Sequence, residues 1–127
     1  MEEFRGFRVR RGDVNDLDFI EEIERLSFGD ESYPRNLLRY LLEWERTLIL
    51  ECSDGVIGYL SYVYLGSIAH IVSIAIHPDY RGIGLGEVLL REAIEDMKKL
   101  GVHRVLLEVK VDNVAAIKLY SKVGFEI

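Results

Sequence analysis

The chain has 127 residues, of which 49% are hydrophobic, and these two values fit one folded domain of ordinary size. Charged residues make up 30% and only two residues are proline, which excludes an intrinsically disordered chain. The formal net charge of -6 argues against a nucleic-acid partner, because neutralising phosphates requires a concentrated basic face. Since the sequence shows neither a membrane-spanning apolar run nor a signal-peptide pattern, we expect a cytoplasmic protein without a membrane partner.

The first part of the chain predicts one strand followed by two helices. Alternating residues predict a strand over 7–11, and Asp13 is placed to cap a helix that ends near Ser27. Residues 27–34 predict a loop, and Pro34 then opens a second, short helix at its first helical position.

Basic residues are concentrated at one point of this part of the chain. Arg8, Arg10 and Arg11 form the only dense basic cluster among 16 Lys and Arg residues. We interpret this cluster as an exposed strand edge with solvated charges, since basic residues protect edge strands from further pairing. An anionic ligand must therefore be held locally elsewhere.

The middle of the chain predicts three strands in succession. They cover residues 47–52, 56–65 and 68–76, and short turns at 53–55 and 66–67 join them. Short links between consecutive strands are typical of an antiparallel meander.

The last part of the chain alternates helices with one strand. An apolar face predicts a helix over 88–100 that ends at Gly101, and a strand is expected over 104–111. Asp112 or Asn113 can cap a final helix over about 114–122. The predicted fold class is therefore α+β, with one central sheet.

A glycine-rich turn lies between the third meander strand and the helix that follows it. Gly82, Gly84 and Gly86 let backbone N–H groups approach an anion at the helix N-terminus, which favours a phosphate or pyrophosphate ligand. Glycines at such a turn also occur for packing alone. A Walker loop is excluded because Glu87 stands where its lysine is required. A Rossmann unit is disfavoured, because the glycine spacing differs and the preceding meander is antiparallel.

Two blocks of sequence resemble the GCN5-related N-acetyltransferases, the GNAT family. Residues 81–86 (RGIGLG) match the acetyl-CoA loop of that family, and residues 108–125 match a second family segment. The stretch 73–125 looks especially similar to the RimI-type protein N-terminal acetyltransferases. Residues 31–34 and 70–76 are similar to the archaeal N-alpha-acetyltransferases.

This resemblance implies a single GNAT domain over residues 1–127. Its fold would be a central, mostly antiparallel mixed sheet flanked by helices. The family continues beyond the Gly-Phe segment with further strands, so we expect a C-terminally truncated domain that lacks the usual C-terminal strands. An incomplete sheet edge would favour self-association.

The resemblance also implies acetyl-CoA as the cosubstrate. Backbone groups of one strand would pair with the pantetheine arm, and backbone N–H groups of the glycine turn would hold the pyrophosphate, with Arg81 as the charged member before them. Asn113 would contact the cofactor, although capping of the last helix explains it equally well. The implied residues are Ile74, Ala75, Ile76, Arg81, Gly82, Ile83, Gly84, Leu85, Gly86, Glu87 and Asn113.

Two residues are candidates for proton transfer in an acetyl transfer to an amine. Glu108 lies among apolar residues in the predicted last strand, where it is either a salt-bridged surface residue or a general base acting through water. Tyr120 lies two helical turns after Asn113, so the two share a face. It is either a core aromatic or the acid that protonates the leaving thiolate, since a phenol titrates near about 10.

Four further residues are candidates for substrate binding. Phe28, Glu31 and Tyr33 would line the peptide entrance by resemblance, where Glu31 could attract an ammonium group, although a solvated acidic turn is the alternative. By the same resemblance, His70 is expected near Glu108, where it serves either a structural role or a proton relay. One histidine and one carboxylate make no metal site, so no metal is expected.

The function so predicted is acetylation of the α-amine of a protein or peptide by direct attack on acetyl-CoA. An α-amine titrates near about 8 and a lysine near about 10.4, so a modest base suits the former. The alternatives are a lysine or small-molecule amine acetyltransferase and a non-catalytic acyl-CoA-binding module.

Overall fold

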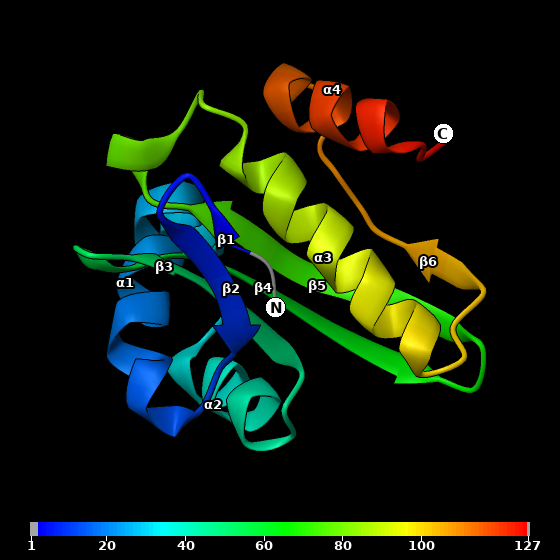
Figure 1. Cartoon of the computed structure of the whole chain (residues 1–127), viewed down its shortest axis with the longest axis horizontal. Helices are drawn as coiled ribbons and strands as arrows, with labels where there is room; N and C mark the ends of the chain where they lie inside the picture. The colour runs from blue at the N-terminus through cyan, green and yellow to red at the C-terminus, as the bar shows by residue number, and fades with distance from the viewer. Residues whose placement is uncertain (1–2, 127) are drawn as a thin grey trace.

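The computed structural model describes residues 3–126, and within them one mixed sheet carries helices on both faces (Figure 1). The strands are β1 (Glu3–Phe4), β2 (Phe7–Arg11), β3 (Thr47–Cys52), β4 (Gly55–Leu65), β5 (Ile68–Ile76) and β6 (Arg104–Leu106). The α-helices are α1 (Leu17–Phe28), α2 (Arg35–Glu43), α3 (Leu85–Lys99) and α4 (Val114–Val123). Short 3₁₀ turns cover Val14–Asp16, Gly29–Glu31 and Pro78–Tyr80. None of the helices in 3–126 is long and apolar enough to cross a membrane.

The six strands lie in the sheet in chain order, from β1 to β6. All neighbours are antiparallel except β5 and β6, which are parallel. The antiparallel meander of β3, β4 and β5 is thereby confirmed, and so is the predicted mixed α+β class.

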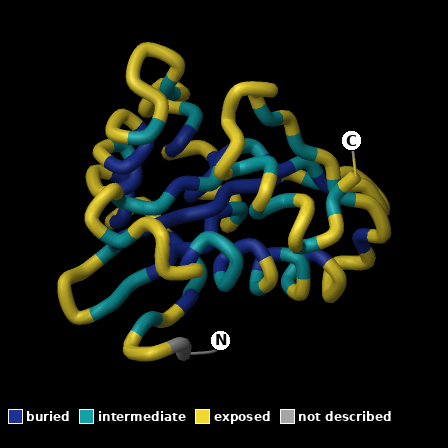
Figure 2. Tube along the Cα trace, turned by 90° about the horizontal axis from the view of Figure 1, so that it is seen from above, coloured by how far each residue is buried: buried dark blue, intermediate teal, exposed yellow. Residues whose placement is uncertain are grey.

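Each face of the sheet has its own apolar core. The side chains of α1 and α2 pack with Ile49, Tyr59 and Ala75 on one face. The α3 side chains pack on the other face, and α4 covers the same core with partly buried side chains. Figure 2 shows the buried residues gathered along the central strands, with exposed residues in the surrounding turns.

A β-bulge divides the central strand β5. Ser61 pairs with Ser73 while Tyr62 pairs with Ile71, so Val72 is an extra residue on β5. One extra residue exchanges the faces of the strand. Accordingly, Ala69 and Ile71 face the α3 core before the bulge, while Ala75 faces the α1 core after it.

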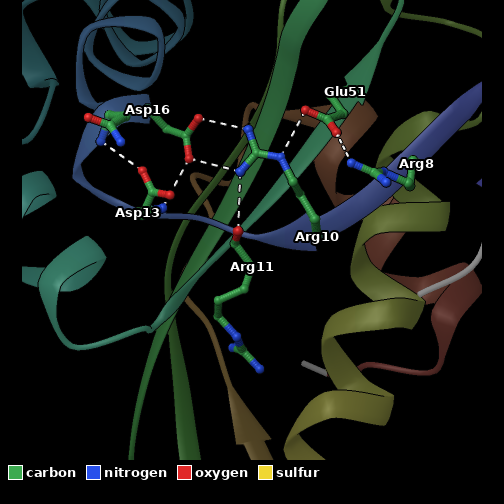
Figure 3. Close-up of polar contacts among 7 residues, drawn as sticks. Arg8, Arg10, Arg11, Asp13, Asp16 and Glu51 are labelled. Atoms are coloured by element: carbon green, nitrogen blue, oxygen red, sulfur yellow. Dashed lines mark hydrogen bonds and ion pairs between the residues drawn. The ribbon is translucent and has the colours of Figure 1, made fainter.

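The basic cluster on β2 differs from our expectation. The strand lies between β1 and β3, so it is not an edge of the sheet. Arg10 donates to both carboxylate oxygens of Asp16 at 2.8 and 2.9 Å and to Glu51 at 2.8 Å, and Arg8 also contacts Glu51. Figure 3 shows Arg10 between the two carboxylates. The expected solvated charges are instead ion pairs that join β2 to β3 and to the start of α1.

Four further expectations need correction. The predicted strand 104–111 ends at Leu106, and the chain continues without regular structure to Lys110. Residues 29–31 of the predicted loop form a 3₁₀ turn. Pro34 caps α2 rather than occupying its first helical position. The short strand β1 was not predicted, since two residues are too few to show alternation.

Candidate functional site

Two cavities meet at the open side of β5. The first has a volume of about 470 Å³ and lies between the end of α1 with its following turn and residues 107–113. The second has a volume of about 540 Å³ and lies between the end of β5, the glycine turn and α4. We call them the carboxylate cavity and the glycine cavity. The residues lining both are Ser27, Phe28, Ile74, Asn113, Ala116 and Tyr120.

The glycine turn leads directly into the N-terminus of α3. Gly84 is the residue before the helix and has a φ of 89°, and Gly82 has a φ of 81°. Both values lie in the left-handed region, which side-chain-bearing residues rarely adopt. Gly86 packs closely against α4, since a Cβ there would lie 3.2 Å from the Leu119 side chain. The turn therefore brings unpaired backbone N–H groups of the first helical turn to the wall of the glycine cavity.

Arg81 connects the glycine turn to β5 and α1 through hydrogen bonds. Its Nε donates to the carbonyl of Ile76 at 2.8 Å, and its guanidinium also donates to Ser27 Oγ at 2.9 Å. The side chain thus spans from the glycine turn to the end of β5 and to α1. This placement assigns Arg81 a positioning contact within the protein, in addition to its charge at the cavity wall.

Glu87 lies in the first turn of α3 and interacts with two cations. Lys122 and Arg91 contact its two carboxylate oxygens, each at 2.9 Å. The hydrogen bonds from Lys122 and Arg91 hold the pKa of Glu87 below its usual value. Lys118 and Lys122 of α4 line the same cavity as Arg81, so its wall carries three cationic side chains and one carboxylate.

The strand β5 has an unpaired edge between the two cavities. Its ladder with β6 ends at the pair His70 and Leu106, whereas its ladder with β4 continues to Ile76. Within the described residues, no strand pairs with this edge beyond the bulge. Ile74, Ala75 and Ile76 all line the glycine cavity. These are the three strand residues that, according to the resemblance, would pair with the pantetheine arm.

Glu108 and His70 are neighbours, as the sequence predicted. His70 Nε2 lies 2.5 Å from a carboxylate oxygen of Glu108, across the gap between β5 and the segment after β6. The environment of Glu108 differs from our expectation, because it lies past the end of β6 and its side chain is 79% exposed. A water molecule can therefore reach this carboxylate from the carboxylate cavity, which Glu108 lines.

Tyr120 lies where the two cavities meet. Its ring packs edge-on against Phe125 at a centroid distance of 6.0 Å. Burial raises the pKa of Tyr120, so the phenol keeps its proton at neutral pH. Asn113 also lines both cavities, and its side-chain oxygen accepts a hydrogen bond from the backbone N–H of Ala116, so it caps α4.

The loop after α1 forms the opposite wall of the carboxylate cavity. Phe28, Glu31 and Tyr33, the three residues expected at a peptide entrance, all line this cavity. Glu31 is bound by the ammonium group of Lys110, and this contact connects the two walls of the cavity. Both side chains are exposed, so the ion pair is weak and solvent-screened.

The same cavity holds a buried carboxylate that was not predicted from the sequence. Glu24 of α1 is 1% exposed and accepts hydrogen bonds from Tyr59, from Ser73 and from the backbone N–H of Tyr33. A signal was present, because Glu24 follows Ile20 by four positions and so lies on the apolar face of α1. A charged residue at that position needs a polar partner in the core.

Comparison with known proteins identifies the family of this architecture. Residues 17–125 match the model of the acetyltransferase (GNAT) family. The N-alpha-acetyltransferase of Sulfurisphaera tokodaii is 34% identical over 137 residues, covering 96% of this chain and 81% of that protein. The N-alpha-acetyltransferase of Saccharolobus solfataricus is 31% identical, with the same two shares covered.

Solved structures show the same fold. Ard1 from Thermoplasma volcanium superposes with a TM-score of 0.88 at 27% identity, covering 96% of this chain and 84% of that chain. The ribosomal-protein-S18-alanine N-acetyltransferase from Escherichia coli gives a TM-score of 0.84 at 27% identity, covering 94% of this chain and 77% of that chain.

Proposed function

Because the chain belongs to the acetyltransferase (GNAT) family, we propose that it transfers the acetyl group of acetyl-CoA to the α-amine of a protein or peptide. The relatives named N-alpha-acetyltransferase support this acceptor class. Acetyl-CoA supplies the thioester whose acetyl group is transferred.

The main support for this proposal is that the glycine cavity has an excess of positive charge and the carboxylate cavity an excess of negative charge. The glycine cavity has three cationic side chains, one carboxylate and a helix N-terminus, which together favour an anionic pyrophosphate. The carboxylate cavity has four carboxylates, on Glu24, Glu31, Glu108 and Asp112, and a single ammonium group on Lys110. An excess of negative charge favours a positively charged amine. The cavities meet at Tyr120, so a donor in one and an acceptor in the other would lie end to end.

The residues at the junction suit a direct transfer. Glu108 would take a proton from the acceptor ammonium through water, which its exposure permits, while His70 holds the carboxylate in place. The free amine would then form a bond to the acetyl carbon while the C–S bond breaks, and Tyr120 would give its proton to the leaving thiolate. The phenolate would regain a proton that the acylated nitrogen loses, through water. The unpaired edge of β5 at Ile74 to Ile76 offers backbone groups to the donor's arm, and the glycine turn would hold its phosphates.

A turnover assay tests the proposal. The protein is incubated with acetyl-CoA and peptides that differ in their first residue, each also supplied with a blocked N-terminus and an internal lysine. We expect release of the CoA thiol and a mass gain only for peptides with a free α-amine. Acetylation confined to lysine side chains or small diamines would contradict the proposal. Binding of acetyl-CoA without turnover on any amine would identify a binding module instead.

Glu108→Gln tests the role of the base in the same assay. The variant removes the proton acceptor and keeps the shape of the side chain. Raising the pH supplies free amine directly, so the loss of turnover should shrink as the pH approaches about 8, where an α-amine titrates. A loss that is the same at every pH would assign Glu108 a different role.

A further inference from the structure

The carboxylates of the carboxylate cavity differ in how strongly solvent screens their interaction with a bound acceptor. Glu31 and Glu108 have side chains that are 64% and 79% exposed, so water screens both. Each also has a partner, Lys110 for Glu31 and His70 for Glu108. Glu24 is 1% exposed and lines the same cavity. Asp112, the fourth carboxylate of the cavity, is also exposed, so the Glu24 carboxylate is the least screened of the four.

All the hydrogen-bond partners of Glu24 are neutral. One carboxylate oxygen accepts from Tyr59 and, at 2.8 Å, from Ser73, and the other accepts from the Tyr33 backbone N–H at 2.8 Å. No Lys, Arg or His within residues 3–126 forms an ion pair with it. Glu24 is thus a buried carboxylate without a compensating cation among the described residues.

A buried charge without a counter-charge is costly, and the network around it does not neutralise it. Ser73 is the first residue after the bulge and is followed by Ile74, which lines the junction of the two cavities. Tyr33 belongs to the loop that walls the cavity on the opposite side. The Glu24 carboxylate therefore lies among the residues that line the carboxylate cavity, where the acceptor is proposed to bind.

From these contacts we infer that Glu24 determines acceptor specificity by attracting the substrate's α-ammonium group, the missing counter-charge of its buried carboxylate. The inference rests on the proposed function and extends it. An ammonium about 7 Å away at an effective dielectric constant of about 20 gains enough energy for a tenfold or greater effect on affinity. A neutral N-terminus gains nothing from this charge.

Glu24→Gln tests the inference because it removes the charge and keeps the shape. The amide can accept from Tyr33 with its oxygen and donate to Tyr59 and Ser73 with its NH₂ group. Binding is measured with coenzyme A present, for an acceptor peptide that the wild type acetylates and for the same peptide already N-acetylated. We expect about a tenfold loss of affinity for the free-amine peptide and less than a twofold change for the acetylated one. The KM for the peptide should rise by the same factor, with kcat changing less.

Two controls separate charge from structure. Glu22→Gln removes a charge from the solvent face of the same helix and should leave both affinities unchanged. Ser73→Ala weakens the network but keeps the charge, so it should preserve the preference for the free amine. If Glu24→Gln does not fold, the combined change Glu24→Leu, Tyr59→Phe and Ser73→Ala removes the charge together with its side-chain donors. It should show the same loss of preference.

Equal losses for the two peptides in Glu24→Gln would mean a purely structural role and would overturn the inference. Unchanged affinity for the free-amine peptide would overturn it as well. Both results leave the proposed function intact, because the wild type acetylates the peptide. A wild type that acetylates no α-amine would overturn the proposed function and the inference together.

Discussion

The side chain of Tyr120 makes two distinct contributions, the packing of its ring and the proton of its hydroxyl. The ring contacts Phe125 edge-on and adds to the core beneath α3 and α4. Burial keeps the pKa of the phenol above its ordinary value, so the group is a proton donor throughout the physiological range. A substitution that removes only the hydroxyl oxygen therefore tests proton donation while the packing of the ring is kept.

We expect Tyr120→Phe to lower turnover roughly tenfold to a thousandfold at every pH, because the leaving thiolate loses its proton donor. The affinity for acetyl-CoA should stay nearly the same, since the ring remains. Single-turnover kinetics under saturating substrates measure the first quantity, and calorimetry measures the second. Full turnover of Tyr120→Phe in the chemistry-limited regime would remove this residue from the mechanism.

At the scale of elements, the site depends on how β5 passes into α3. The bulge at Val72 turns the strand over, and the missing ladder beyond His70 opens its edge. The glycine turn then places the N-terminus of α3 beside that edge. A strand edge and a helix N-terminus together offer two rows of backbone donors, which makes the cradle depend on conformation more than on side-chain charge.

Gly84→Val should therefore lower the affinity for acetyl-CoA by tenfold or more while the protein remains folded. A Cβ at Gly84 meets nothing within 4 Å, so the cost is the left-handed φ of 89°, about 1–2 kcal/mol for other residues. The backbone would shift to relieve it, and the N–H groups would lose their alignment. Isothermal calorimetry with coenzyme A gives the affinity.

Gly66→Val is the matched control for Gly84→Val. Gly66 has a φ of 59° in the turn between β4 and β5, and a Cβ there also meets nothing within 4 Å. This control should lower the melting temperature and leave coenzyme A binding unchanged. A folded Gly84→Val that binds coenzyme A as tightly as the wild type would place the cradle elsewhere.

For the whole molecule, ion pairs connect the α1 layer to the sheet. Arg10 of β2 joins Asp16, just before α1, to Glu51 of β3 (Figure 3). Burial opposes the ionisation of Asp16, but hydrogen bonds from Arg10 and from the Asp13 backbone outweigh it, so the pKa of Asp16 lies below its ordinary value. The hydrogen bond from Arg10 likewise lowers the pKa of Glu51.

These lowered pKa values predict how stability depends on pH. A carboxyl group with a lowered pKa in the folded state stabilises the protein above its unfolded pKa, about 4, and this contribution disappears as the pH falls through the folded value. Asp16→Asn should therefore cost about 2 kcal/mol at neutral pH, and its difference from the wild type should vanish in acid. Urea unfolding across the acid range measures both.

Asp18→Asn provides the comparison for Asp16→Asn. Asp18 also pairs with an arginine, but its side chain is 81% exposed, and exposed pairs contribute little. The unfolding free energy of Asp18→Asn should stay within about 0.5 kcal/mol of the wild type. The two unfolding free energies, of Asp16→Asn and of the wild type, could instead differ by the same amount below about pH 3. Asp16 would then act only through its hydrogen bond with the Asp13 backbone N–H.

The sequence by itself determined the order of the elements after β1 and the glycine turn before α3. Turns at 53–55 and 66–67, the apolar face of α3 and the glycines before it depend on residues close together in the chain. Local patterns of this kind show in a sequence because neighbouring residues determine backbone conformation and helix faces. The cap by Asn113 followed from the same reasoning and is present. The pairing of His70 with Glu108, 38 positions apart, is also present, but it was expected from the family resemblance.

Only the tertiary structure decided which charges are buried and which face water. Glu24 meets Ser73 across 49 positions, and Arg10 meets Glu51 across 41, so no local pattern reports either contact. Glu108 was expected inside a strand, yet the bulge at Val72 and the divergence of β6 from β5 leave it exposed. The physical reason is that burial of a charge depends on sheet register and on the helix packed above it, and both are properties of distant segments brought together.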